Sequence, residues 1–304
     1  RDYADLVPMV KEFLAAVRID ACPQAACFAI AGPVVNNRSQ LTNLAWSLES
    51  DRIADELGLK QVELINDFAA VGYGVLGLQA DDMHTLQSGV YNPQSPIAII
   101  GAGTGLGQGF LINCDGEYQV FPSEGGHVDF APRSELEFQL LRYLVEKHSI
   151  SRVSVERVVS GQGIISIYQF LRDRKFASES EELGQVVRNW EQNAGRRSEL
   201  PDPAAAISKA AGNDRLAGRT MEIFVDAYGA AAGNLALKFL PYGGLYVAGG
   251  VTAKNIDLIR NGSFLSAFSN KGRMSPLLDD VPLYLVTNQN VGLIGAALRA
   301  SQIA

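Results

Sequence analysis

Two adjacent polar residues, Asn66 and Asp67, follow the apolar residues Leu64 and Ile65 in the segment QVELINDF at 61–68. The segment predicts a strand, and AAVGYGVLGL after it predicts a helix. Asp67 could be the N-cap of that helix, because Asp is common at this position. A functional interpretation is equally strong, because ligands of α/β proteins bind where strands end. There a carboxylate could accept a proton from a nucleophilic hydroxyl while Asn66 orients the same substrate.

Glycines crowd the segment GAGTGLGQG at 101–109. A dinucleotide-binding fingerprint needs glycines at 101, 103 and 106 before a helix, but position 106 is Leu and the following residues are strand-like. The P-loop pattern fails too, because no Gly-Lys-Ser/Thr is present. The segment therefore favours a strand–turn–strand cradle in which backbone N–H groups and the Thr104 hydroxyl bind phosphate. The alternative is a tight glycine turn with a bulge.

A carboxylate and an imidazole flank two glycines in SEGGHVDFAP at 123–132, where Glu124 and His127 fall in a predicted loop. Glu accepts hydrogen bonds from hydroxyl groups and neutral His can donate and accept, so the pair suits a polyhydroxylated ligand. The alternative is a surface loop with a satisfied His. We expect no metal site, because the other histidines, at 84 and 148, lack ligand spacing to His127.

Two further segments have both structural and functional interpretations. In SVERVVSGQG, Ser154 could cap a helix and place Glu156 in its first turn, where an acid is favourable. In GGLYVAGGV, the pair Gly249–Gly250 follows a buried strand. These glycines either allow close strand–helix packing or let the backbone approach a flat ligand such as adenine.

The composition indicates a globular protein with sizeable cores. The 304 residues are 47% hydrophobic and 19% charged, with a net charge of −7. Such a surface repels a phosphate backbone, so we expect no nucleic-acid partner. Polar residues, Pro and Gly break the longest apolar region, Ala227–Ala253, so we expect no membrane span. Three scattered cysteines, at 22, 27 and 114, favour a reducing cytoplasm.

Hydrophobic periodicity predicts an α/β chain in two lobes. We expect helices at 3–17, at 50–59 with Ser50 or Asp51 as N-cap, across much of 134–240, and at GLIGAALRA. We expect strands at AACFAIAGPVV, within 97–122 on both sides of an Asp115–Gly116 turn, at GGLYVAGGV and at VPLYLVTN. The polar, turn-rich stretch Gln79–Pro96 predicts a domain boundary.

Taken in order, these motifs resemble the bacterial glucokinase family, hexokinase-like ATP:glucose 6-phosphotransferases with the two-lobed α/β actin-like ATPase (ribonuclease H-like) fold. The resemblance covers the chain from about residue 28 to its C-terminus, in the stretches AIAGPV, LTNLAW, ELINDFAAV, GAGTGLG, EGGHVDFAP, SVERVVSG, GGLYVAGG, KGRM and NVGLIGAA. It implies a small domain of residues 1–77 with 290–304 and a large domain of residues 78–289. The oligomeric state stays open, with a homodimer as one alternative.

The resemblance also implies a role for each candidate residue. Asp67 would be the general base on the 6-hydroxyl of glucose. The residues implied to bind the other sugar hydroxyls are Asn43, Asn66, Glu124, His127 and Glu156. Those implied to bind ATP are Gly101, Gly103, Thr104 and Gly105 at the phosphates and Gly249 and Gly250 at the adenosine. Mg²⁺ would arrive with the ATP.

One family motif, an N-terminal Asp-x-Gly-Gly-Thr phosphate loop, is absent from these 304 residues. We expect that roughly the first forty residues of the family pattern are absent here, comprising three strands of the small lobe and half of the phosphate site. Residues 1–304 by themselves are then expected to transfer phosphate slowly or not at all.

A non-catalytic sugar-binding or regulatory relative of the sugar kinases is the alternative to an enzyme. Such relatives carry an N-terminal DNA-binding helix-turn-helix and commonly a cysteine-rich zinc site after the His-containing motif. No cysteine follows His127 in this chain, which favours the kinase.

Overall fold

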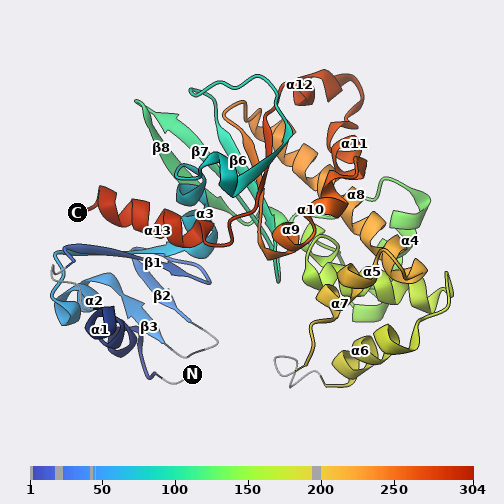
Figure 1. Cartoon of the computed structure of the whole chain (residues 1–304), viewed down its shortest axis with the longest axis horizontal. Helices are drawn as coiled ribbons and strands as arrows, with labels where there is room; N and C mark the ends of the chain where they lie inside the picture. The colour runs from blue at the N-terminus through green and yellow to red at the C-terminus, as the bar shows by residue number, and fades with distance from the viewer. Residues whose placement is uncertain (1–2, 18–22, 42–43, 45, 194–199) are drawn as a thin grey trace. The chain divides into compact units, whose positions relative to one another are not determined.

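The computed structural model describes residues 3–17, 23–41, 44, 46–193 and 200–304 (Figure 1). The chain divides into two compact units. Unit 1 comprises Arg1–Asp82, Tyr118–Pro122 and Asn288–Ala304, and unit 2 comprises Met83–Glu117 and Ser123–Thr287. We propose these units as the two domains. Their boundaries differ by a few residues from the expected 77/78 and 289/290, and unit 1 also includes 118–122.

Unit 1 contains short strands and the helices around them. Its elements are α1 Leu6–Val17, β1 Ala25–Ile30, β2 Arg38–Gln40, β3 Ser47–Glu49, α2 Ser50–Leu57, β4 Gln61–Asn66, α3 Asp67–Val75, η1 Ala80–Asp82 and α13 Val291–Gln302.

Strands β1 and β4 run parallel, and their last residues, Ile30 and Asn66, are partners in the register. Val62 and Leu64 of β4 are buried in the same core cluster, as the alternation of a strand allows. Asn66 and Asp67 therefore lie at the carboxyl end of a parallel pair. The N-cap of α2 is Glu49, without a side-chain cap bond, so the expected cap at Ser50 or Asp51 is wrong by one or two residues.

Helix α3, which begins at Asp67, packs closely on α13. A Cβ on Gly295 would collide with the Ala70 carbonyl, and one on Gly74 would collide with the Val291 carbonyl. Glycine at these positions lets the two backbones approach without a side chain between them. This close packing fixes the position of the helix that carries Asp67.

Unit 2 is built on a sheet with many helices. Its elements are β5 Met83–Gln87, β6 Ile97–Ala102, β7 Leu106–Cys114, η2 Gly125–His127, α4 Glu135–His148, η3 Val155–Arg157, α5 Gly161–Asp173, α6 Glu181–Gln192, α7 Pro203–Ala210, α8 Arg215–Phe239, β9 Leu245–Ala248, α9 Gly250–Lys254, α10 Ile256–Arg260, α11 Ser263–Ser269, η5 Gly272–Met274, α12 Ser275–Asp279 and β10 Leu283–Val286. Strand β8, Glu117–Ser123, is divided between the units, because residues 118–122 are counted in unit 1.

The sheet has the strand order β5-β10-β9-β6-β7-β8. Strand β9 pairs in parallel with both β6 and β10, whereas β6 and β7 form an antiparallel pair. The expected turn at Asp115–Gly116 is confirmed, with both residues at positive φ. The stretch Gln79–Pro96 was expected to be turn-rich, but it contains β5. This strand pairs with β10, which lies some 200 positions later in the chain and is invisible to local sequence patterns.

The long helix α8 supplies much of the unit 2 core. Asp214 caps it by accepting the Ala217 N–H. Two of its glycines, Gly229 and Gly233, lie against backbone carbonyls of Phe264 and Phe268 in α11, so the two helices pack closely. Tyr228 of α8 is buried in the same core, and its hydroxyl group contacts Ala102 of the sheet.

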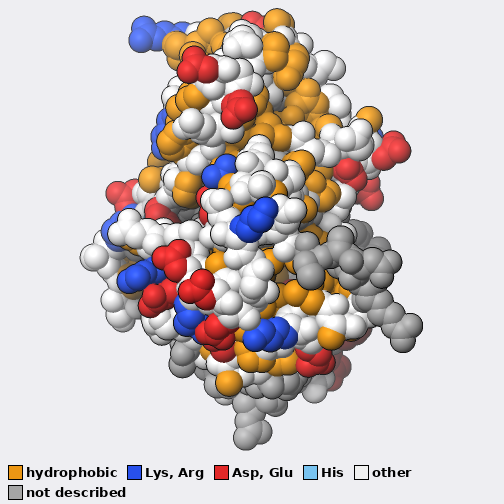
Figure 2. Space-filling model, turned by 90° about the vertical axis from the view of Figure 1, so that its left-hand side faces the viewer, with side chains coloured by type: hydrophobic (Ala, Val, Ile, Leu, Met, Phe, Trp, Pro, Cys, Tyr) orange, Lys and Arg blue, Asp and Glu red, His pale blue; other side chains and the backbone are white. Residues whose placement is uncertain are grey.

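Acidic and basic side chains are interspersed on the face that Figure 2 displays, without a large basic patch among the described residues there. In the described part of the chain, no helix is long and apolar enough to cross a membrane.

Candidate functional site

The two polar residues at the end of β4 have different tasks. Asn66 is the N-cap of α3, and its Oδ1 accepts the N–H groups of Phe68 at 2.9 Å and Ala69 at 3.3 Å. Its amide nitrogen donates to the Gly32 carbonyl at 3.1 Å. Asp67 is the first residue of the helix itself. The interpretation of Asp67 as the N-cap is therefore wrong, because Asn66 already satisfies the N–H groups that a cap would accept.

The Asp67 carboxylate remains accessible. Its Oδ1 shares the Phe68 N–H at 2.8 Å, and the residue is exposed at the surface of unit 1. Surrounding protein atoms still displace part of the water around the carboxyl group, and this desolvation raises its pKa above the ordinary Asp value against the opposing hydrogen bonds. A carboxylate with a raised pKa is a stronger base than an ordinary Asp.

The expected strand–turn–strand structure at the glycine-rich segment is confirmed. Ala102 and Leu106 are the last pair of the β6–β7 ladder, so the turn consists of Gly103, Thr104 and Gly105. The Gly103 N–H donates to the Gly105 carbonyl at 2.8 Å. Thr104 is exposed, and a Cβ built on Gly103 would meet nothing within 4 Å. The turn therefore presents an open backbone surface, as a phosphate cradle requires.

Glu156 lies directly behind this turn. Its Oε2 accepts the Leu106 N–H at 2.9 Å, and a Cβ on Gly105 would collide with the carboxylate. Ser154 is the N-cap residue of η3, as expected, but its side chain makes no cap bond and η3 is a single 3₁₀ turn. The sequence thus places the acid correctly in a first turn, but its partner is the backbone of β7.

The N-terminus of α5 also contacts the turn. Ser160 caps this helix by accepting the Gly163 N–H at 3.0 Å, and the Gly161 N–H donates to the Gly103 carbonyl at 2.8 Å. The positive end of a 13-residue helix therefore lies beside Thr104. Such an end favours anionic groups.

The pair Gly249–Gly250 lies beside the end of β6. Gly249 has a φ of +93°, and a Cβ there would collide with the Ala102 carbonyl, so the position requires glycine on both counts. Gly250 begins α9. Both glycine segments thus meet at the carboxyl ends of the parallel strands β6 and β9, where α/β proteins bind ligands.

The buried side chain of Tyr228 connects the Gly103–Gly105 turn and the Gly249–Gly250 segment through hydrogen bonds to residues next to each of them. Its hydroxyl oxygen accepts the Ala102 N–H at 3.0 Å and lies 2.9 Å from the Thr252 hydroxyl in α9. The Thr252 hydroxyl donates in turn to the Ala248 carbonyl at 2.7 Å. Burial raises the pKa of Tyr228 to about 12, so its hydroxyl stays neutral at physiological pH.

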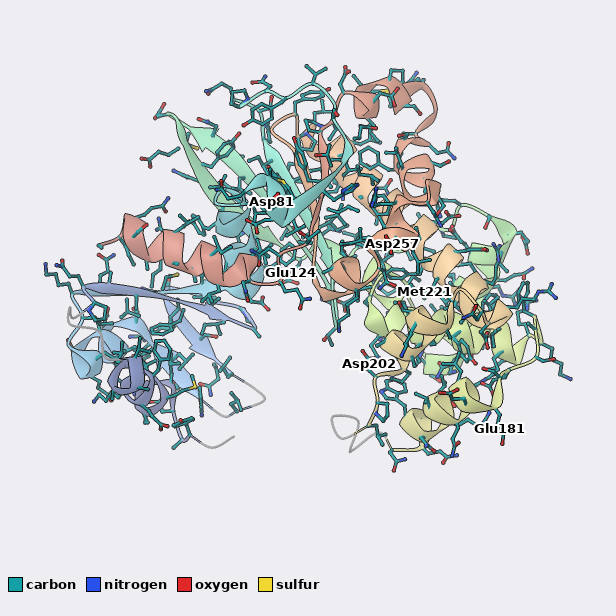
Figure 3. The ribbon with its side chains drawn as sticks, viewed as in Figure 1. Asp81, Glu124, Glu181, Asp202, Met221 and Asp257 are labelled. Atoms are coloured by element: carbon teal, nitrogen blue, oxygen red, sulfur yellow. The ribbon has the colours of Figure 1, made fainter. Side chains whose placement is uncertain are left out.

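A cavity of about 1030 Å³ opens beside the two glycine segments, entirely within unit 2. Gly103, Thr104 and Gly250 line it together with the start of α5. Figure 3 labels two of its acids, Asp202 before α7 and Asp257 on α10. Lys209 and Lys254 add basic side chains to the wall. The volume suits a nucleotide-sized ligand.

Glu124 and His127 lie close together, with 3.8 Å between Glu124 Oε2 and His127 Nε2. Their side chains are 88% and 58% exposed, so both can accept a ligand. Arg152 fixes this segment: it donates to the His127 carbonyl and forms an ion pair with Asp129 at 2.6 Å.

A second cavity of about 270 Å³ is polar and joins three of the candidates. His127, Glu156 and Thr104 all line it, with Ser154 and Ser160. Thr104 thus borders both cavities. A ligand rich in hydroxyl groups in the smaller cavity would lie next to the turn that also faces the larger one.

The remaining predicted residues are distributed as follows. Gly101 is buried inside β6 opposite Gly107, so its place is in the sheet rather than on the turn. Asn66 and Asp67 belong to unit 1, whereas Glu124, His127 and Glu156 belong to unit 2. Asn43 lies outside the described residues. Within the described ranges, no three His, Cys, Asp or Glu residues are grouped to hold a metal ion.

Comparisons with known proteins give a consistent family. A family model described as Glucokinase matches residues 1–303. A glucokinase of Nostoc sp. strain PCC 7120 is 64% identical over 304 residues, covering 99% of this chain and 89% of that protein. One of Synechocystis sp. strain PCC 6803 is 53% identical over 307 residues, covering 99% and 86%.

Solved structures agree. The crystal structure of a glucokinase from an Antarctic psychrotroph matches with a TM-score of 0.83 at 32% identity, covering 99% of this chain and 87% of that one. A ROK family glucokinase from Streptomyces griseus, in complex with glucose and AMPPNP, matches with a TM-score of 0.63, covering 98% and 88%. At 23% identity this second match supports the fold alone.

Proposed function

The chain belongs to the glucokinase family and has its α/β actin-like ATPase fold, and we propose that it transfers the γ-phosphate of ATP to the 6-hydroxyl of glucose. The observation that best supports this reaction is the position of Thr104. Its turn borders both the nucleotide-sized cavity and the small polar cavity. A phosphate bound at this turn would lie between donor and acceptor.

ATP fits the larger cavity by the chemistry of its wall. The open turn at Gly103–Gly105 and the N-terminus of α5 favour phosphates, and Gly249–Gly250 lets an adenosine approach the backbone. Mg²⁺ would arrive on the phosphates, keep several of its waters and neutralise developing charge.

The sugar would be bound through its hydroxyl groups. Glu156, Glu124 and His127 supply acceptors and a donor, and we propose Asn66 and Asn43 as further contacts. Asn66 Oδ1 is used in capping α3, and its amide nitrogen donates to the Gly32 carbonyl and also hydrogen-bonds the Asp67 carboxylate.

Asp67 would act as the general base. Its carboxylate accepts the proton of the sugar 6-hydroxyl as that oxygen forms its bond to the γ-phosphorus and the bond to the ADP oxygen breaks. In phosphoryl transfer the protein contributes mainly positioning and charge stabilisation, with one carboxylate to receive this proton. The raised pKa of Asp67 suits that task.

A coupled assay of glucose-dependent ADP formation, on the protein as its gene encodes it, tests the function. We expect turnover that requires glucose, ATP and Mg²⁺ together, and mannose and fructose measure the sugar preference. Glucose binding in calorimetry without any turnover would reject the kinase in favour of a non-catalytic sugar-binding relative.

We also propose a cytoplasmic location, on the scattered cysteines, of which Cys27 and Cys114 are free thiols. Cell fractionation tests the location. Light scattering on the purified protein distinguishes a homodimer from a monomer.

A further inference from the structure

A third cavity, of about 570 Å³, lies in unit 2 between α8 and the segment 128–133. Among the described residues it shares no lining residue with the two cavities above. Its polar wall consists of Gln108, Asp129, Arg133, Asn234, Lys238, Asn270 and Lys271. Its apolar floor consists of Val128, Phe130, Ala131, Val155, Ala227, Ala230, Ala231, Leu235 and Leu237. Neither the proposed catalysis nor the proposed nucleotide site uses it.

Lys271 is one of the basic residues that line this cavity. It begins the KGRM stretch, and its ammonium donates to the Ala230 carbonyl at 3.1 Å and to Asn234 Oδ1 at 2.8 Å. Both partners are neutral. In the described part of the chain, no carboxylate lies within ion-pair distance of this ammonium. Its positive charge is therefore stabilised by neutral acceptors and not by an ion pair.

The surroundings of Lys271 disfavour the charged form of its ammonium group. Burial lowers the pKa of Lys271, and the nearby Arg133 guanidinium lowers it further. The aliphatic stem of Lys271 crosses Gly233, where a Cβ would meet it, so the side chain is held in place. A half-buried charge without a counter-ion is unfavourable, and an anion in the cavity would remove this cost.

The acids at the cavity are already engaged. Asp129 is paired with Arg152, and Glu137, which pairs with Arg133, is buried beside it. Lys238 adds a further exposed positive charge at the wall. The cavity is thus lined by both cationic and apolar side chains, in a volume typical of small-molecule sites.

One wall of the cavity is connected to the proposed sugar residues. The Phe130 N–H donates to the Val153 carbonyl at 2.8 Å, and the Val155 N–H donates to the Val128 carbonyl at 2.9 Å. These bonds join the two segments that continue into His127 and Glu156. A ligand that presses on Val128, Phe130 and Val155 therefore acts on both segments together.

We propose that this cavity binds a small organic anion, a carboxylate or phosphate ester with a compact apolar body, and that its occupancy changes the affinity for glucose. The second part rests on the proposed function. The anionic head would contact Lys271 and Lys238, and the apolar body would cover the side chains of Phe130, Val155 and Leu235.

The binding test uses phenyl phosphate and benzoate as probes and benzyl alcohol as their neutral counterpart. Calorimetry is carried out with the nucleotide site saturated by a non-hydrolysable ATP analogue, so that this site cannot take the probes. We expect saturable binding of an anionic probe and none of benzyl alcohol. Absence of saturable binding by both anions would overturn the proposal. Lys271 would then have only a structural role, through its hydrogen bonds to Ala230 and Asn234 of α8.

Lys271→Met keeps the aliphatic stem across Gly233 and removes the ammonium group, with its charge and its hydrogen bonds to Ala230 and Asn234. We expect it to weaken the bound probe by about tenfold, the loss of one charge-assisted hydrogen bond. Lys11→Met, at an exposed position of α1, is the matched control and should leave binding unchanged. If Lys271→Met unfolds, Lys238→Met provides the same comparison. Equal binding by wild type and the charge variants would also reject the site.

Coupling is measured as the dissociation constant of glucose with and without the probe. We expect a change of at least threefold in wild type that disappears in Lys271→Met. Probe binding without any change in glucose affinity would overturn the coupling. Absence of turnover, by contrast, would reject the kinase and leave the probe-binding result intact.

Discussion

The N–H of Phe68 donates to Asn66 Oδ1 at 2.9 Å, and this bond makes Asn66 the N-cap of α3. The adjacent carboxylate of Asp67 accepts a share of the same N–H and a hydrogen bond from the Asn66 side chain, which opposes the desolvation that raises its pKa. The helix therefore does not depend on Asp67 for its start. A carboxylate at the end of a buried strand that is neither the cap nor in an ion pair among the described residues is available for chemistry.

Asp67→Asn should separate catalysis from binding. The amide keeps the shape but cannot accept the hydroxyl proton, so we expect kcat to fall by about 10²-fold or more. The glucose dissociation constant should stay within a few-fold of wild type. Steady-state kinetics and calorimetry measure the two quantities. An equal loss in both would make Asp67 a binding or structural residue.

Thermal stability provides the control for this variant. Asn66→Ala should destabilise the protein by about 1 kcal/mol, the usual effect of losing an N-cap. Asp67→Asn should not. Comparable destabilisation by the two variants would return the cap to Asp67.

The pH dependence of kcat should report the protonation of the Asp67 carboxylate, the proposed general base. Because desolvation raises the pKa of Asp67, the carboxylate becomes protonated at a higher pH than an ordinary Asp as the pH falls. We therefore expect an acidic decline of kcat centred above the ordinary Asp range, and its absence in Asp67→Asn. A pH profile that is unchanged by the substitution would assign the decline to another group.

The same shift has a consequence for stability. A carboxyl group whose pKa is raised by folding binds its proton more tightly in the folded state. Its contribution is therefore most favourable at acidic pH and is lost as the pH rises through the folded-state pKa. Relative to wild type, Asp67→Asn should be at least as stable at neutral pH.

Parts of the site could be predicted from the sequence and parts could not, for physical reasons. The turn at Gly103–Gly105 was predictable because strand periodicity and glycine content are local. The choice between Asn66 and Asp67 as cap was not, since both residue types cap helices and only the backbone geometry distinguishes them. Tyr228 was missed because its sequence signal is that of any buried aromatic residue in a helix. Its role depends on Ala102 and Thr252, which are distant in the chain.

The two glycines of the turn should respond differently to the same added methyl group. In Gly105→Ala the Cβ displaces the Glu156 carboxylate, so we expect a raised KM for glucose. In Gly103→Ala the Cβ enters open space where a phosphate would lie, so we expect a raised KM for ATP and normal stability. Kinetics with each substrate varied in turn distinguishes the two effects. Identical profiles for the two variants would contradict these separate roles.

Tyr228→Phe should weaken the binding of ATP without changing the binding of glucose. The substitution leaves the buried Ala102 N–H without its acceptor, which costs about 1–3 kcal/mol, and removes the connection to Thr252. We expect a KM for ATP raised several-fold, with glucose binding within twofold of wild type. Thr252→Val, which keeps the bond between Tyr228 and Ala102, should show a smaller effect of the same kind. A uniform loss of stability with both KM values unchanged would show that Tyr228 supports the core and does not position the two glycine segments.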